Sequence, residues 1–338
     1  MKVYFANKIS AAIFCVLLVG CIPAIAQPKQ AAQPVLSEDE QKLAAAINAA
    51  PDLAAKLNAA ADLIKKYPKT SLRLQVVENM ASQVANVTDN AQKLALAQQL
   101  LTIFNEPAEV DIVGPVAVQA YADTNQADGA FAKGAELLAR APDAVTLLVQ
   151  LVAIGSDQVK KQNGKFVTQS IQHANQAISL IEANKKPARV DEARWTAYKA
   201  QTLPALYQST GLLNFANGNR SEAKASYTKA SQLNPSDAFN FIMLGAMLNE
   251  EYQTEAKQYQ AMPPGPARDA QLTKVQGLLD SVIDAYAHGV ALSEGNAALQ
   301  SIRAQYLQDL ESYFKYRHSG STDGMQALID KYKAPAKP

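Results

Sequence analysis

The sequence has few of the residue types from which reactive sites are usually built. Its 338 residues include two Cys, three His and one Trp. Both Cys lie within the first 21 residues, so the remaining chain holds neither a disulfide framework nor a nucleophilic thiol. It also lacks a Gly-x-Ser-x-Gly elbow, a P-loop and a dinucleotide-binding fingerprint. These absences predict a protein that is not an enzyme and carries no cofactor.

The chain also has no marked excess of positive or negative charge. The chain has 32 basic and 31 acidic residues, a net charge of +1, which gives no basic surface for nucleic acid or for lipid headgroups. His173, His288 and His318 are far apart, and none sits in a helical metal-binding motif. We therefore expect neither a metal site nor a nucleic-acid partner.

The first 26 residues have the pattern of a secretory signal. Lys2 and Lys8 precede an apolar run over 11–22, and Ala24-Ile25-Ala26 forms a small-x-small cleavage site. The run is shorter than the roughly 20 residues that cross a bilayer as a helix. We expect an exported protein, periplasmic or secreted.

A second interpretation of this leader remains open. Leu18-Val19-Gly20-Cys21 resembles a bacterial lipobox, in which the Cys is lipidated after cleavage. Cys21 would then anchor the protein to a membrane as a lipoprotein. In both interpretations residues 27–36, rich in Pro, Gln and Ala, form a flexible linker.

The rest of the chain reads as helix. Ser37 and Glu40 form a capping-box pattern that opens the first helix. From there to residue 333, amphipathic segments alternate with short polar turns, and no stretch shows the period-2 alternation of a strand. An all-α fold is therefore expected.

Prolines separate these predicted helices at similar intervals. Five of them each follow an Ala- and Leu-rich segment: Pro68, Pro107, Pro142, Pro187 and Pro235. Because proline disfavours helix at the residue before it, a recurring proline ends a helix at regular places. Intervals that accommodate two helices predict a repeat of helical hairpins.

Residues 204–237 resemble the tetratricopeptide repeat (TPR), a 34-residue helix–turn–helix unit. The matching positions, including the start of the next unit, are Tyr207, Gly211, Ala223, Tyr227, Ala230, Pro235, Phe241, Leu244 and Gly245. The resemblance implies an α-solenoid of antiparallel helix hairpins that winds as a right-handed superhelix. In it, small residues lie where helices approach closely and Tyr227 fills the space between them.

The resulting organisation has six parts. They are a signal peptide (1–26), a linker (27–36), repeat-like hairpins (37–187), a TPR region (188–295), a terminal hairpin (296–333) and a tail (334–338). The prolines at 263, 264 and 266 predict a non-helical loop inserted near 254–270 within the TPR region.

The resemblance also implies function: TPR proteins usually bind proteins or peptides through a concave face. The Lys, Asn and Arg residues with which some members hold a peptide carboxylate are absent from the corresponding positions. Leu212, Phe239 and Ile242 would instead line an apolar groove. We expect a non-catalytic interaction scaffold of the bacterial envelope with a protein or peptide partner. The alternatives are a lipoprotein that supports an envelope assembly complex and a hydrolase on a helical scaffold.

Overall fold

The computed structural model of the chain describes residues 36–333. The signal peptide, Cys21, the tail and all but the last residue of the 27–36 linker lie outside this range. The described residues divide into two compact units, 36–199 and 200–333, and the division falls within one helix.

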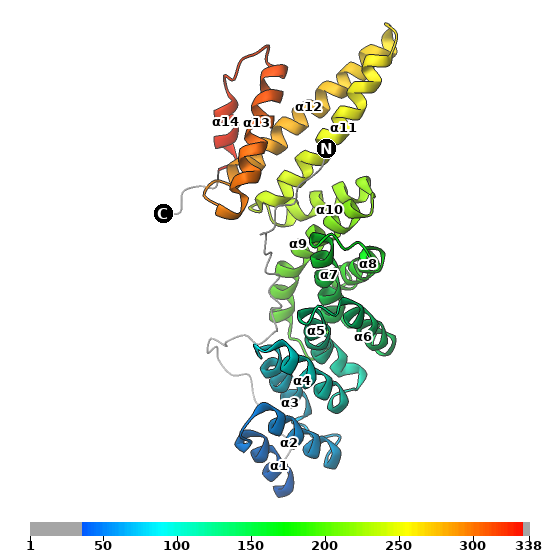
Figure 1. Cartoon of the computed structure of the whole chain (residues 1–338), viewed down its shortest axis with the longest axis vertical. Coiled ribbons are helices and arrows are strands. Elements are labelled where there is room, and N and C mark those ends of the chain that lie inside the picture. The colour runs from blue at the N-terminus through cyan, green and yellow to red at the C-terminus, as the bar shows by residue number, and fades with distance from the viewer. Residues whose placement is uncertain (1–35, 334–338) are drawn as a thin grey trace. The chain divides into compact units, whose positions relative to one another are not determined.

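The described residues form fourteen α-helices and one short 3₁₀ turn, without a strand (Figure 1), which confirms the expected all-α fold. The first eight are α1 (Glu38–Ala49), α2 (Leu53–Lys66), α3 (Arg73–Ala85), α4 (Asn90–Ile103), α5 (Pro107–Asp123), α6 (Ala127–Arg140), α7 (Val145–Lys160) and α8 (Val167–Glu182). The others are α9 (Glu192–Ala216), α10 (Arg220–Leu233), α11 (Ala238–Ala261), α12 (Pro266–Leu292), α13 (Gln300–Arg317) and α14 (Met325–Lys331).

Local chemistry sets where these helices begin and end. At the start of α1, the Glu40 amide donates to Ser37 Oγ at 3.2 Å, and the Ser37 amide donates to Glu40 Oε2 at 3.3 Å. This is the reciprocal capping box. Helices α2, α4, α6, α8 and α10 each end within five residues before one of the five recurring prolines. Four of these prolines therefore lie in the connections between successive hairpins, and Pro107 is the first residue of α5.

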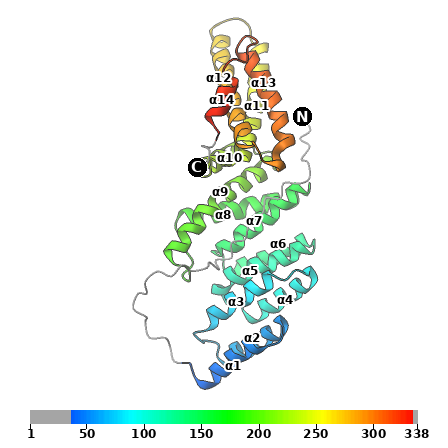
Figure 2. The ribbon, with the colours of Figure 1, turned by 90° about the vertical axis from the view of Figure 1, so that its left-hand side faces the viewer.

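In the unit of residues 36–199, each hairpin packs on the next one. Helix α3 packs on α5, α5 packs on α7, and α2 packs on α4 (Figure 2). Helix α5 lies between neighbours and is buried on most of its circumference, including Asp111 and Glu109. Its buried residues belong to two successive hydrophobic clusters, one shared with α1–α4 and the other with α6 and α7. Stacking of neighbours alone builds such a core, as in helical repeat proteins.

The unit of residues 200–333 is dominated by the long pair α11 and α12, on which α13 and α14 both pack. The expected loop near 254–270 is much shorter, because only residues 262–265 separate the two helices. Pro266 is the first residue of α12, where a missing amide hydrogen costs nothing. The inserted residues therefore extend both helices, and the Arg268 guanidinium stacks on the Tyr259 ring at 4.8 Å.

No helix among the described residues has both the length and the apolar character needed to cross a membrane.

Candidate functional site

The TPR motif positions bring a glycine of one helix against an aromatic ring of the next. A Cβ added to Gly211 of α9 would lie 2.8 Å from two ring carbons of Tyr227 in α10. Gly245 of α11 meets the ring of Tyr286 in α12 in the same way. The Tyr227 ring is fully buried, and so are Ala223 and Ala230 on the same helix. These residues hold the hairpins together.

The other motif residues are also packed or lie at a turn. Tyr207 is half-buried on α9, and Pro235 is exposed in the connection after α10. Leu244 contributes to the cluster around Tyr227. The Phe241 ring stacks on His288 with their centroids 3.5 Å apart.

The predicted apolar groove is not an open surface. Leu212 is 6% exposed and Ile242 is 3% exposed, while the half-buried Phe239 packs edge-on against Tyr227. Ile242 is covered because α12 approaches α11 closely at Gly289, where an added Cβ would lie 2.9 Å from an Ile242 side-chain carbon. The helical pattern identified apolar positions correctly, but the neighbouring helix uses Ile242 for packing.

The three histidines lie in different aromatic environments. His288 is sandwiched between Phe241 and Tyr332, and burial lowers its pKa. Burial also lowers the pKa of His173, which stacks on Phe131. The His318 ring stacks on Phe314 at 4.0 Å. In the described part of the chain, no group of three or more His, Cys, Asp or Glu residues is placed to hold a metal ion.

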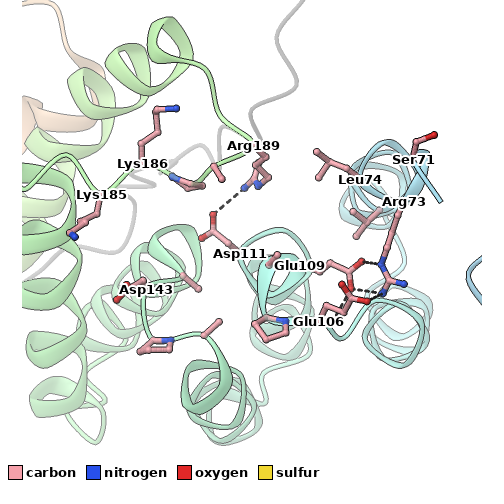
Figure 3. Close-up of a pocket in the computed structure, with 18 of the residues that line it drawn as sticks. Ser71, Arg73, Leu74, Glu106, Glu109, Asp111, Asp143, Lys185, Lys186 and Arg189 are labelled. Atoms are coloured by element: carbon pink, nitrogen blue, oxygen red, sulfur yellow. Dashed lines mark hydrogen bonds and ion pairs between the residues drawn. The ribbon is translucent and has the colours of Figure 1, made fainter. Parts of the chain in front are cut away.

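A cavity of about 760 Å³ lies within the unit of residues 36–199 (Figure 3). Its walls come from the connections before α3, α5, α7 and α9 and from the N-terminal residues of α3 and α5. Pro107, Pro142 and Pro187 all line it. The cavity therefore forms where the connections between successive hairpins come together.

Arg73 closes one side of this cavity through a saturated network. Its Nε donates to Glu109 Oε1 at 2.6 Å, and its Nη2 donates to Glu109 Oε2 at 3.0 Å. Nη2 also lies 3.3 Å from a Glu106 oxygen, and Nη1 donates to the Pro68 carbonyl at 3.0 Å. Bidentate geometry and several acceptors hold this guanidinium in one place.

Arg189 closes the other side and comes from the connection between α8 and α9. Its Nη2 donates to Asp111 Oδ2 of α5 at 3.1 Å, and its Nη1 to Glu78 Oε1 of α3 at 3.4 Å. Its Nε is buried and has no hydrogen-bond partner among the described residues. The Arg189 side chain is 13% exposed. One arginine from a distant segment therefore bridges carboxylates of two hairpins.

Asp111 is the buried end of this network. The Thr146 amide donates to Asp111 Oδ1 at 2.7 Å, and the Thr146 hydroxyl donates to the same oxygen at 2.7 Å. Burial raises the pKa of Asp111, while Thr146 and Arg189 act in the opposite direction. The carboxylate stays buried because it is hydrogen-bonded and faces a cation.

Reasoning from the sequence did not single out Arg73, Asp111 or Arg189. One local signal existed: Asp111 follows Val110 and precedes a long apolar run on a helix. A carboxylate in such a stretch requires a partner. The identity of that partner, 78 residues further along the chain, has no local signal.

No family model matches this sequence, and no curated protein matches it. Among solved structures, the C-terminal part of a TPR repeat-containing protein from Cytophaga hutchinsonii is similar with a TM-score of 0.43 and 10% sequence identity. The match covers 87% of this chain and 92% of that chain. The description of this fold as stacked helical hairpins rests on the helices of the chain itself.

Proposed function

We propose that this protein is a non-catalytic, protein-binding scaffold of the bacterial cell envelope, built from TPR-like helical hairpins. The observation that carries the proposal is the cavity at the edge of the unit of residues 36–199. Its volume of about 760 Å³ is within the range of sites that enclose a ligand or several side chains of a partner.

The lining of the cavity suits contact with a polypeptide. Leu74 is 43% exposed at its wall, beside proline and alanine residues that present small apolar surfaces. A partner could bury this exposed leucine and the small apolar surfaces beside it, with the paired charges forming the polar rim that protein interfaces have. The charged groups of Arg73 and Arg189 are paired with carboxylates, which favours recognition over acid–base chemistry.

Affinity capture with two matched variants tests this proposal. Leu74→Glu places a charge in the cavity wall, whereas Leu233→Glu changes a leucine of the same exposure, 42%, at the end of α10 in the other unit. Crosslinked capture from an envelope extract should recover one partner with wild type and with L233E but not with L74E. A partner retained by L74E would move the binding site elsewhere, and the lack of a specific partner would contradict the function.

Export is part of the proposal, and the leader supports it. The protein is either released after cleavage at Ala26 or held at a membrane by lipid on Cys21, which would make it a lipoprotein that supports an envelope assembly. The intact mass of the mature protein distinguishes the two. A chain that starts at unmodified Gln27 would contradict the lipoprotein, and an uncleaved chain would contradict both.

A further inference from the structure

The surface around Asp111 and Glu78 already holds an arginine from elsewhere in the chain. Arg189 reaches it from the connection between α8 and α9, 78 residues after Asp111 and 111 residues after Glu78 (Figure 3 shows the contact with Asp111). The contact within the chain therefore shows that Asp111 and Glu78 can bind an arginine side chain.

The two arginines at the cavity are held very differently. Arg73 makes a bidentate pair with Glu109 and has two further acceptors. Arg189 makes one contact to each of two carboxylates, at 3.1 and 3.4 Å, and its Nε has no acceptor among the described residues. A guanidinium that makes only single contacts and leaves one buried N–H unpaired is held less strongly than one in a bidentate pair. Arg189 is therefore the more readily displaced of the two.

The charge balance at Asp111 and Glu78, where Arg189 binds, favours a cation. Asp111 and Glu78 together carry two negative charges against the single positive charge of Arg189. Over the whole lining of the cavity, four carboxylates are balanced by the four cations Arg73, Lys185, Lys186 and Arg189, so the excess of negative charge is local to Asp111 and Glu78. A basic side chain that took the place of Arg189 would face both carboxylates, whereas an acidic one would be repelled there.

We propose that Asp111 and Glu78 form an arginine-binding site that Arg189 fills in the free protein, and that the partner of the scaffold is an extended segment carrying an arginine that takes its place. This inference rests on the proposed binding function and specifies the chemistry of the ligand. Arg189 competes at a high effective concentration, on the order of millimolar for a tethered group, and so sets a threshold for binding.

Peptide binding to defined variants tests the site. Arg189→Ala empties it, and Lys185→Ala is the matched control, because Lys185 is an exposed cation in the same connection that lines the same cavity. The probe is a fluorescent peptide with the sequence of residues 183–191, compared with a version in which Ala replaces its arginine. Fluorescence anisotropy should show at least ten-fold tighter binding of the arginine peptide to R189A than to wild type or K185A.

Two further measurements sharpen the result. The Ala-bearing peptide should bind none of the proteins, and Glu78→Gln in the R189A background should weaken binding of the arginine peptide several-fold. Circular dichroism checks that R189A is folded. If it is not, Arg189→Lys takes the place of R189A in the same experiment, because a lysine keeps the positive charge but loses the guanidinium that contacts both carboxylates at once.

Equal binding of both peptides by R189A, or no binding of either, would overturn the arginine site. Tighter binding of a peptide that carries aspartate instead of arginine would overturn the sign of the charge. These outcomes are independent of the capture experiment, since L74E reports whether the cavity binds a protein at all. A partner lost with L74E together with failure of the arginine peptide would leave the scaffold function intact and reject this ligand.

Discussion

Replacing Gly211 with alanine tests the close approach of α9 and α10 directly. The added methyl group would lie 2.8 Å from two carbons of the Tyr227 ring and 2.9 Å from a third. Carbon atoms in contact are normally about 3.5–4.0 Å apart. The ring cannot move aside without disturbing a core in which it is completely buried.

Two effects of opposite sign determine the magnitude. Alanine is favoured over glycine inside a helix by about 1 kcal/mol. Overpacking of a well-packed core costs about 1–3 kcal/mol and can cost more. Because the overlap here involves a ring and not the end of a flexible chain, we place the cost at about 3 kcal/mol. The net destabilisation expected for G211A is then about 2 kcal/mol.

Gly277 supplies the control within the same unit. It lies inside α12 with no atom within 4 Å of an added Cβ. Gly277→Ala should therefore stabilise the protein by about 0.5–1 kcal/mol through helix propensity alone. The same chemical change is thus expected to have opposite signs at two positions.

Urea unfolding followed by circular dichroism measures both variants, with the slope of the transition checked for each because the chain has two units. A double variant isolates the contact: in a Tyr227→Leu background, G211A should lose most of its cost. If G211A stabilises the protein as much as G277A does, the packing argument for this hairpin is refuted.

Three other predictions follow from buried polar groups. The Tyr227 hydroxyl is buried without a hydrogen-bond partner among the described residues. Tyr227→Phe should therefore leave the free energy of unfolding unchanged or raise it by up to about 1 kcal/mol, measured by thermal unfolding. A clear loss of stability would show that the hydroxyl has a hydrogen-bond partner. Burial lowers the pKa of His173 below its ordinary value of 6.5, so near that pH the unfolded chain binds more protons at His173 than the folded chain does. Stability should therefore fall as the pH drops through 6.5, and His173→Leu should reduce this fall. An unchanged pH dependence of the melting midpoint in His173→Leu would contradict the reasoning. Arg73→Met should leave Glu109 buried and unpaired and cost about 3 kcal/mol in urea unfolding. Lys315→Ala, which breaks an exposed ion pair with Glu311, should cost less than about 1 kcal/mol. Equal losses would contradict the expected difference between the buried and the exposed ion pair.

The sequence anticipated most local features of the fold because their causes are local. Helical periodicity depends on residues three and four positions apart, and the capping box at Ser37 depends on a partner three residues away. Proline acts on the residue directly before it, so the five recurring prolines marked the ends of the hairpins.

The errors arose where a local rule competed with packing. Several prolines near residue 264 suggested a long loop, yet one of them is tolerated as the first residue of α12 and the other two fit within residues 262–265. Leu212 and Ile242 were expected in a groove because apolar residues occupy either a binding face or a core. Only the position of neighbouring helices determines which.

The sequence by itself thus determined that this protein is helical, that its helices pair as hairpins, and where those hairpins end. Only the tertiary structure decided which distant side chains meet when the hairpins stack. Arg189 meets Asp111 and Glu78 because stacked hairpins bring the N-terminal halves of α3 and α5 close to the connection before α9. Ion pairs between residues so far apart in the chain leave no periodic trace in the sequence, since only the burial of α5 and the stacking of its neighbours bring their charges together.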